Sequence, residues 1–173
     1  MTGSSHKTFP GPQGGFLLSS SEDPAFHRKL NNAMFPGVCS SYHLHHVAGK
    51  VMALAEFKEY GAAYAKDIVA NAQAFAAALA AEGFDVLAES RGYTASHQVL
   101  TRHGELDSGA GAKAAQKLEQ AGIITNMNML PGDTKALAPS GLRLGVQELT
   151  RVGFTTDDIC LLYTSDAADD TPC

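Results

Sequence analysis

Apolar side chains recur at helical spacing over one long stretch in the middle of the chain. Residues 47–60 show this period first, and residues 64–79 repeat it after an interruption at Gly61. Gly83 follows, where a glycine commonly ends a helix in the left-handed conformation. The pattern predicts either two long helices or one bent helix over residues 46–82.

The segments on both sides of this stretch are shorter. Residues 1–15 are rich in Gly and Pro and predict a loop that leads into a buried strand at Phe16–Leu18. Beyond Gly83 the pattern indicates several short elements, namely strands at 84–87, 97–100 and 142–146, a helix at 110–120 and an apolar pair at 123–124. This order predicts a small α/β layer that begins near Gly61.

The composition narrows the class of protein. Among 173 residues, 45% are apolar, and 13 Lys and Arg stand against 18 Asp and Glu, a net charge of −5. No apolar run approaches the ~20 residues of a membrane span, and the first residues lack the pattern of a secretory signal. An acidic chain without a basic cluster is not suited to phosphate backbones. We expect a cytoplasmic protein that binds neither membranes nor nucleic acids.

The C-terminal residues continue none of these patterns. Thr155–Asp158 is typical of a helix start, but the apolar period stops after it. Read as codons, residues 160–170 resemble one frame of the transposase adapter used in shotgun sequencing libraries. We therefore interpret residues 155–173 as a truncated helix start and an adapter-derived tail, and exclude 160–173 from the fold; a genuine acidic tail is the alternative. Outside this tail only Cys39 remains, which argues against a disulfide framework.

Lys7 is the first candidate for chemistry. It stands in a segment of Ser, His, Pro and Gly ahead of the apolar residues at 16–18. A phosphate-binding loop does not fit, because no glycine precedes Lys7 at the required distance. Two readings remain, a lysine with a lowered pKa that forms a Schiff base and a solvent-facing loop lysine.

Arg143 is the second candidate. In the predicted strand it lies on the face opposite Leu142 and Leu144, where its planar guanidinium can bind a carboxylate; a salt bridge to a neighbouring acidic residue is the alternative. Three histidines, His43, His45 and His46, form a further cluster. No paired cysteine or acidic ligand accompanies them, so we predict no metal site.

Taken together, these motifs resemble the serine hydroxymethyltransferase family. The resemblance covers almost all of residues 2–154 and rests on four blocks, T-G-S-S-H-K-T-F with G-P-Q-G-G at 2–15, F-P-G at 35–37, S-G-L-R-L-G at 140–145 and T-R-V-G-F at 150–154. Members are fold-type I pyridoxal phosphate enzymes, usually dimers or tetramers of dimers. The resemblance implies the C-terminal part of the large cofactor-binding domain at 1–60 and the small α/β domain at 61–154.

The resemblance also implies roles for individual residues. Lys7 is the lysine that holds pyridoxal 5'-phosphate covalently, and His6 is its catalytic neighbour in the cofactor pocket. Arg143 anchors the substrate carboxylate, and Ser4 contributes to cofactor binding. Ser40 and Ser41 lie in a segment that departs from the family's motif, and we expect their hydroxyls to substitute for it in cofactor binding. The implied reaction converts serine and a tetrahydropterin, tetrahydrofolate or another reduced pterin, into glycine and the methylene-tetrahydropterin by Cα–Cβ cleavage. It belongs to glycine biosynthesis and one-carbon metabolism.

Two departures from the family's pattern leave alternatives open. A second glycine-rich turn usually follows the F-P-G motif and reaches the cofactor phosphate of the neighbouring subunit, whereas here Val38–His46 stands in its place. This variant, together with Gly141–Gln147, also resembles divergent relatives, namely archaeal-type enzymes with another pterin and threonine transaldolases that need no pterin. A threonine aldolase is a related alternative. In addition, the family's lysine lies past the middle of the chain. We therefore expect Met1 to be an internal methionine, the homodimer to require the full-length protein, and this fragment alone to be inactive; a non-catalytic remnant is the other alternative.

Overall fold

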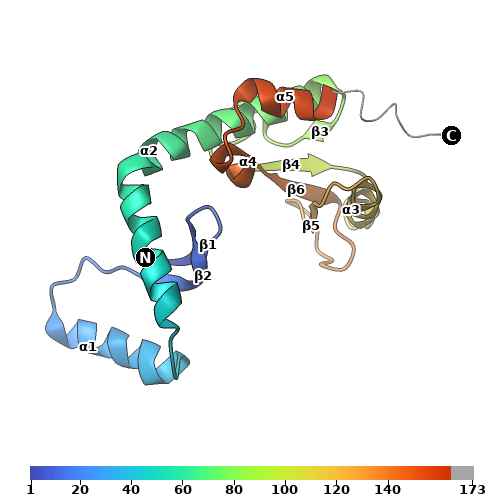
Figure 1. Ribbon diagram of the computed structural model, residues 1–173. Coiled ribbons are helices and arrows are strands. Elements are labelled where there is room, and N and C mark those ends of the chain that lie inside the picture. Colours follow the sequence, from blue (N-terminus) through green and yellow to red (C-terminus); the bar gives the residue numbers. More distant parts are fainter. Residues whose placement is uncertain (165–173) are drawn as a thin grey trace. The chain divides into compact units, whose positions relative to one another are not determined.

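The computed structural model describes residues 1–164, and the chain divides into two units, Met1–Ala62 and a second that begins at Ala63 (Figure 1). The fold is mixed α/β, as the sequence predicts. No helix among residues 1–164 is long and apolar enough to cross a membrane.

Unit 1 opens with a two-stranded antiparallel hairpin, β1 (Thr2–His6) and β2 (Pro10–Leu17). The expectation of a loop up to Gly15 is therefore wrong. Each strand has only one neighbour, so both are edge strands. The prolines of β2, which lack an N–H donor, are tolerated there because the outer edge needs no partner. The glycines serve cross-strand packing, since a Cβ at Gly3 would lie 2.5 Å from the ring of Phe16.

A short helical segment follows the hairpin, and the sequence reading missed it. It consists of α1 (Pro24–Asn32) and η1 (Ala33–Val38). The Asp23 side chain accepts a hydrogen bond from the N–H of Ala25 at 2.8 Å, and Pro24 occupies the first helical position. An aspartate followed by a proline is a common start of a helix, so the local signal was present.

One continuous helix, α2 (Leu44–Ala81), runs from unit 1 into unit 2, which confirms the single-helix alternative. Gly61 does not end it, and a Cβ at this position would lie 2.9 Å from the Phe57 ring. The helix ends at the predicted Gly83, where φ is +88°. Gly83 donates to the carbonyl of Ala80 and Phe84 donates to that of Leu79, which is the bonding pattern of a glycine C-cap.

Unit 2 is built on a four-stranded antiparallel sheet. Its strands are β3 (Asp85–Val86), β4 (Gln98–Arg102), β5 (Asn126–Asn128) and β6 (Gly141–Gly145), in the spatial order β3-β4-β6-β5. The remaining elements are η2 (Glu89–Arg91), α3 (Ala110–Gln120), α4 (Gln147–Arg151) and α5 (Thr156–Thr164). The predicted helix at 110–120 and the strands at 97–100 and 142–146 are confirmed within two residues, whereas Ile123–Ile124 is not a strand.

The core of unit 2 lies between the second half of α2 and one face of the sheet. Ile68, Phe75 and Leu79 of α2 pack against Val99 of β4 and Leu144 of β6. Helix α5 adds Ile159, which is fully buried, and extends over residues 160–164 of the segment expected to be an adapter-derived tail. The rest of that segment lies outside the described residues.

Candidate functional site

Lys7 lies at the tip of the β1–β2 hairpin, between the paired residues His6 and Pro10. Its side chain is exposed, and no hydrogen bond or ion pair joins its ammonium to another described residue. A hydrogen bond between the two strands stabilises the tip, because the buried Ser5 hydroxyl donates to the Pro12 carbonyl at 2.8 Å. The structure therefore presents a primary amine on a fixed turn.

His6 folds back across the same hairpin. Its Nδ1 atom lies 3.3 Å from the N–H of Gly14, which donates to it, and 3.2 Å from the Gly14 carbonyl. Gly14 has a φ of +150°, and a Cβ there would overlap the ammonium of Lys50. Lys50 extends from α2 and donates to the Gly15 carbonyl at 3.5 Å. A second cation, from α2, thus lies against the hairpin. The sequence alone did not indicate it, since forty-three positions separate Lys50 from Lys7 in the chain.

The three serines are dispersed through unit 1. Ser4 lies in β1 opposite Gly15, whereas Ser40 and Ser41 are exposed between η1 and α2. Within residues 1–164, no hydrogen bond connects Ser40 or Ser41 to the hairpin. Their part in cofactor binding stays a prediction. Just beyond them, the rings of His45 and His46 stack edge to face with centroids 4.5 Å apart.

Arg143 lies at the centre of β6, paired with Leu100 of β4 and Asn126 of β5. Its flanking residues Leu142 and Leu144 point to the helix-covered face, so Arg143 projects from the opposite face. Its guanidinium is half-buried and forms no ion pair with the part of the chain that the structure describes. The salt-bridge alternative therefore finds no partner there, and the arginine is available to a carboxylate.

Two further side chains near Arg143 escaped the sequence reading. The pKa of His97 is lowered, first by burial and then by the charge of Arg143, so its imidazole is held neutral. The Oε1 atom of Gln147 is buried without a hydrogen-bond partner among the described residues. It approaches Gly145, two positions from Arg143 on the same face of β6. Gln147 is close to β6 along the chain, whereas His97 comes near Arg143 only through the pairing of β4 with β6.

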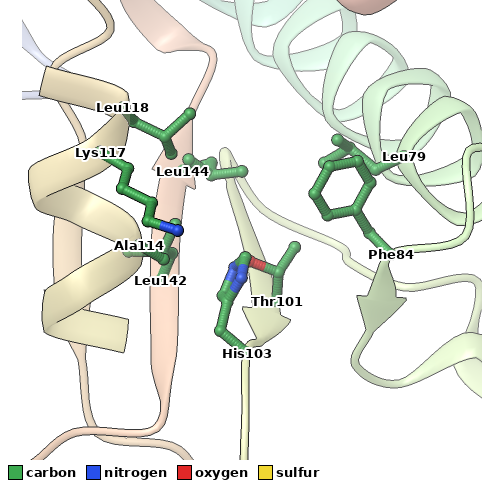
Figure 2. Close-up of a pocket in the computed structure, with 9 residues that line it drawn as sticks. All are labelled: Leu79, Phe84, Thr101, His103, Ala114, Lys117, Leu118, Leu142 and Leu144. Carbon is green, nitrogen blue, oxygen red and sulfur yellow. The ribbon is translucent and has the colours of Figure 1, made fainter. Parts of the chain in front are cut away.

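An apolar pocket of about 200 Å³ lies on the other face of the sheet (Figure 2). Leu79, Leu118, Leu142 and Leu144 line it, and Thr101 and His103 close one side. The Thr101 hydroxyl and His103 Nε2 are 2.9 Å apart, and burial lowers the pKa of His103. Because Leu142 and Leu144 line this pocket, Arg143 faces away from it, and we do not include the pocket in the candidate site.

Lys7 of unit 1 and Arg143 of unit 2, each taken within its own unit, have donors that no other described residue uses. Covalent attachment requires a primary amine that other groups leave accessible, and Lys7 is such an amine. Recognition of an α-carboxylate requires a guanidinium whose donors are not already used, and Arg143 meets this condition. The described chain is thus a mixed α/β protein that presents an accessible primary amine in unit 1 and a guanidinium without an ion-pair partner in unit 2.

Comparison with known proteins identifies the family. The family model "Serine hydroxymethyltransferase" matches residues 1–164, and the chain belongs to this family. A serine hydroxymethyltransferase of Pyrococcus horikoshii is 56% identical over 162 residues, covering 92% of this chain and 38% of the relative. That of Methanopyrus kandleri is 54% identical over 156 residues, covering 89% and 35%. The family resemblance read from the sequence is confirmed, and the chain spans little more than a third of these relatives.

A solved structure matches the whole fold. An L-threonine transaldolase from Pseudomonas fluorescens, crystallised in its internal aldimine state, superposes with a TM-score of 0.84 at 30% identity. The match covers 99% of this chain and 38% of the transaldolase. The predicted fold class, part of a fold-type I pyridoxal phosphate transferase, is confirmed by this likeness.

Proposed function

We propose that this chain contributes the lysine-bearing hairpin and the small domain of a glycine hydroxymethyltransferase. The reaction converts serine and a reduced pterin, such as tetrahydrofolate, into glycine and the methylene-tetrahydropterin. The observation that supports it best is the family match over residues 1–164, within which an exposed amine and an unpaired guanidinium occupy the two family motifs. Pyridoxal phosphate, when bound, withdraws electrons from the substrate Cα and so makes Cα–Cβ cleavage possible.

The chain's own residues then have distinct tasks. Lys7 holds the cofactor covalently, and its position on a fixed turn limits the orientations that the cofactor can adopt. His6, fixed by Gly14, lies beside this attachment point and completes the catalytic pair. Ser4 supplies a hydroxyl to the cofactor from β1, and Ser40 and Ser41 supply hydroxyls to the phosphate from the segment before α2. Arg143 binds the substrate carboxylate through two parallel hydrogen bonds, which orients the Cα substituents.

The same proposal assigns the parts of the chain. Residues 1–60 complete the cofactor-binding domain, and residues 61–154 form the small domain. The first half of α2 exposes Val51, Met52 and Leu54, an apolar surface that further polypeptide of the full-length protein can cover. We propose a cytoplasmic homodimer as the working form, because the segment with Ser40 and Ser41 corresponds to the turn that reaches a neighbouring subunit's cofactor.

A chimera tests this function. Residues 1–164 replace the matching 38% of the Pyrococcus horikoshii relative, and borohydride reduction followed by peptide mapping locates the bound cofactor. We expect a pyridoxyl group on Lys7, pterin-dependent release of glycine from serine, and loss of both in Lys7→Ala. Lys58→Ala, an exposed lysine of the same unit, is the matched control and retains both. A label on any other lysine would contradict the assignment, and an unchanged Lys7→Ala protein would favour a non-catalytic remnant.

A threonine transaldolase is the second candidate, favoured by the structural match to the Pseudomonas fluorescens enzyme. Such an enzyme transfers the glycyl unit of threonine to another aldehyde and needs no pterin. The same chimera distinguishes the two reactions. Product formation from threonine and benzaldehyde in the absence of pterin would support the transaldolase, whereas serine cleavage that depends strictly on the pterin would eliminate it.

A further inference from the structure

Two loops of unit 2 are joined by Asp107 and Asp133. The carboxylate of each aspartate accepts hydrogen bonds from the other loop. The N–H of Asp107 donates to Asp133 Oδ1 at 2.7 Å. In return, the Asp107 carboxylate accepts the N–H groups of Thr134 and Lys135 and the hydroxyl of Thr134, each at 2.7 Å. We call this arrangement the Asp107–Asp133 clamp.

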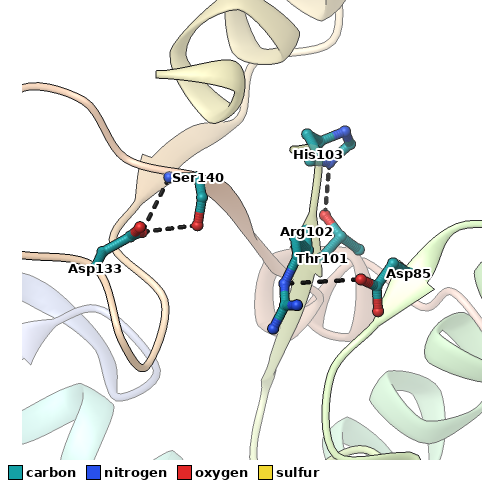
Figure 3. A network of polar contacts seen from close by, with 6 residues as sticks. All are labelled: Asp85, Thr101, Arg102, His103, Asp133 and Ser140. Carbon is teal, nitrogen blue, oxygen red and sulfur yellow. Dashed lines mark hydrogen bonds and ion pairs between the residues drawn. The ribbon is translucent and has the colours of Figure 1, made fainter. Parts of the chain in front are cut away.

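Asp133 also holds the residue that precedes β6 (Figure 3). Its Oδ2 atom accepts the Ser140 N–H at 3.0 Å, the Ser140 hydroxyl at 2.8 Å and the Leu130 N–H at 2.9 Å. Ser140 is fully buried, so its donors have no access to water if the carboxylate is removed. The Ser140 carbonyl accepts the His103 N–H at 3.0 Å, which links the same residue to the end of β4.

The packing around the first residue of β6 leaves little freedom. A Cβ at Gly141 would lie 2.5 Å from the Leu130 side chain. A Cβ at Gly111, in the first turn of α3, would overlap the Gly141 carbonyl oxygen. The start of β6 is thus confined between α3 and the loop that Asp133 organises, and a shift of that loop is transmitted to the strand.

Arg143 lies two residues beyond Gly141 on the same face of β6. Because no described residue pairs with its guanidinium, its position depends on the backbone from which it projects. We propose that Asp133 is a positioning residue for Arg143: by holding Ser140 it fixes the start of β6 and so places the guanidinium for the substrate carboxylate. This inference rests on the carboxylate-binding role proposed for Arg143 above.

Asp133→Asn is the variant of choice, because it keeps the shape of the side chain and exchanges one acceptor oxygen for a donor. Either orientation of the amide turns its NH₂ group toward an N–H or hydroxyl donor that needs an acceptor. Asp158→Asn is the matched control. Asp158 accepts the N–H and hydroxyl of Thr155 at 2.8 and 2.7 Å, and these bonds lie at the start of α5 and do not involve β6.

The first measurement is amide hydrogen exchange of the full chain. In Asp133→Asn we expect exchange at Asp107, Leu130 and Ser140 to accelerate. The effect is about tenfold or more at the donors that face the NH₂ group, and smaller at those that face the remaining oxygen, which has lost its charge. The core amides of α2 stay as protected as before, and Asp158→Asn changes only the start of α5. Unchanged exchange at Ser140 would overturn the inference, since the clamp would then not hold β6.

The second measurement follows the Arg143 Nε–Hε resonance of the full chain while acetate is added as a carboxylate probe. We expect Asp133→Asn to weaken acetate binding at Arg143 by about tenfold, the effect of one well-aligned charged hydrogen bond, and Asp158→Asn to leave it unchanged. Wild-type acetate affinity in Asp133→Asn would overturn the positioning role while leaving that of Arg143 intact. If acetate does not shift the Arg143 resonance of the wild-type chain, the carboxylate-binding role proposed for Arg143 is wrong. The positioning role of Asp133 is then wrong too, even if hydrogen exchange confirms the clamp.

Discussion

At the scale of single residues, side chains far apart in sequence set each other's ionisation. The pKa of Asp133 is raised by partial burial, but the N–H groups of Leu130, Ser140 and Asp107 and the Ser140 hydroxyl together lower it well below its usual range. A lowered pKa favours the ionised carboxylate, which suits a group that accepts four hydrogen bonds. Its burial and charge are tolerated only because every one of these donors is in place.

His97 gives a residue-scale prediction about the surroundings of Arg143. Its pKa is lowered from 6.5, first by burial and then by Arg143, so Arg143→Gln is expected to raise it part of the way back. Arg102→Gln is the control. It removes the ion-pair partner of Asp85 and is expected to leave the pKa of His97 unchanged. Histidine resonances followed by NMR between pH 4 and 8 give the pKa, and an unshifted His97 in Arg143→Gln would contradict the electrostatic contact.

The sign of the accompanying pH effect follows from the same shift. A histidine whose pKa is lower in the folded state favours the neutral form there. Its contribution to the free energy of unfolding is therefore complete above the unfolded pKa of 6.5 and is lost as the pH falls from 6.5 through the folded value. In Arg143→Gln this loss becomes smaller, because the folded pKa approaches that of the unfolded chain.

At the scale of elements, α2 has two halves with different environments. In the half that belongs to unit 2, Ile68, Phe75 and Leu79 are buried against the sheet, whereas Leu54 in the first half is 57% exposed. The helical period of the sequence is the same in both halves. Burial of the apolar stripe is therefore decided by what packs against it, not by the pattern itself.

This contrast predicts unequal costs for the same substitution. Leu79→Ala removes a fully buried side chain from the core and is expected to lower the free energy of unfolding by about 2–5 kcal/mol. Leu54→Ala is the matched control and is expected to change it by less than about 0.5 kcal/mol. Urea unfolding followed by circular dichroism measures both, and equal effects would contradict the assignment of the core to the second half of α2.

At the scale of the whole molecule, the two units differ in how much core they contain. Unit 2 has a continuous cluster of buried apolar side chains, while in unit 1 the buried apolar group is Ala53 and many large side chains face outward, with Met52 65% and Tyr60 63% exposed. Exposed large apolar side chains in such number are typical of a surface that further polypeptide covers. The observation agrees with the 38% coverage of the Pyrococcus horikoshii relative.

A prediction at this scale concerns the two units separately. A polypeptide of residues 63–164 is expected to unfold cooperatively and to bind the dye ANS weakly, because its apolar residues already have partners. The full chain is expected to bind more dye, and the triple variant Val51→Ser, Met52→Gln, Leu54→Gln to reduce that excess. Equal fluorescence from the full chain and from residues 63–164 would contradict an exposed apolar face on unit 1.

Much of the local structure and the family were determined by the sequence alone. The helical period of 46–82, the C-cap at Gly83 and the alternation around Arg143 each depend on neighbouring residues, so each could be read directly. The motifs at 2–15 and 140–145 were sufficient to indicate serine hydroxymethyltransferases, which the family match confirms. The roles of Lys7, His6 and Arg143 themselves stay predictions.

Only the tertiary structure decided the features that depend on contacts between distant segments. The β1–β2 hairpin has no alternating apolar pattern in the sequence, and the contact that pairs Gly3 with the Phe16 ring joins residues thirteen positions apart. The sequence also does not show that Arg143 lacks a salt-bridge partner among the described residues. Nor does it show that Asp133 bonds to Asp107 and Ser140. Local periodicity records which face a residue occupies, but which groups meet there is fixed only when sheet register and loop packing bring them together.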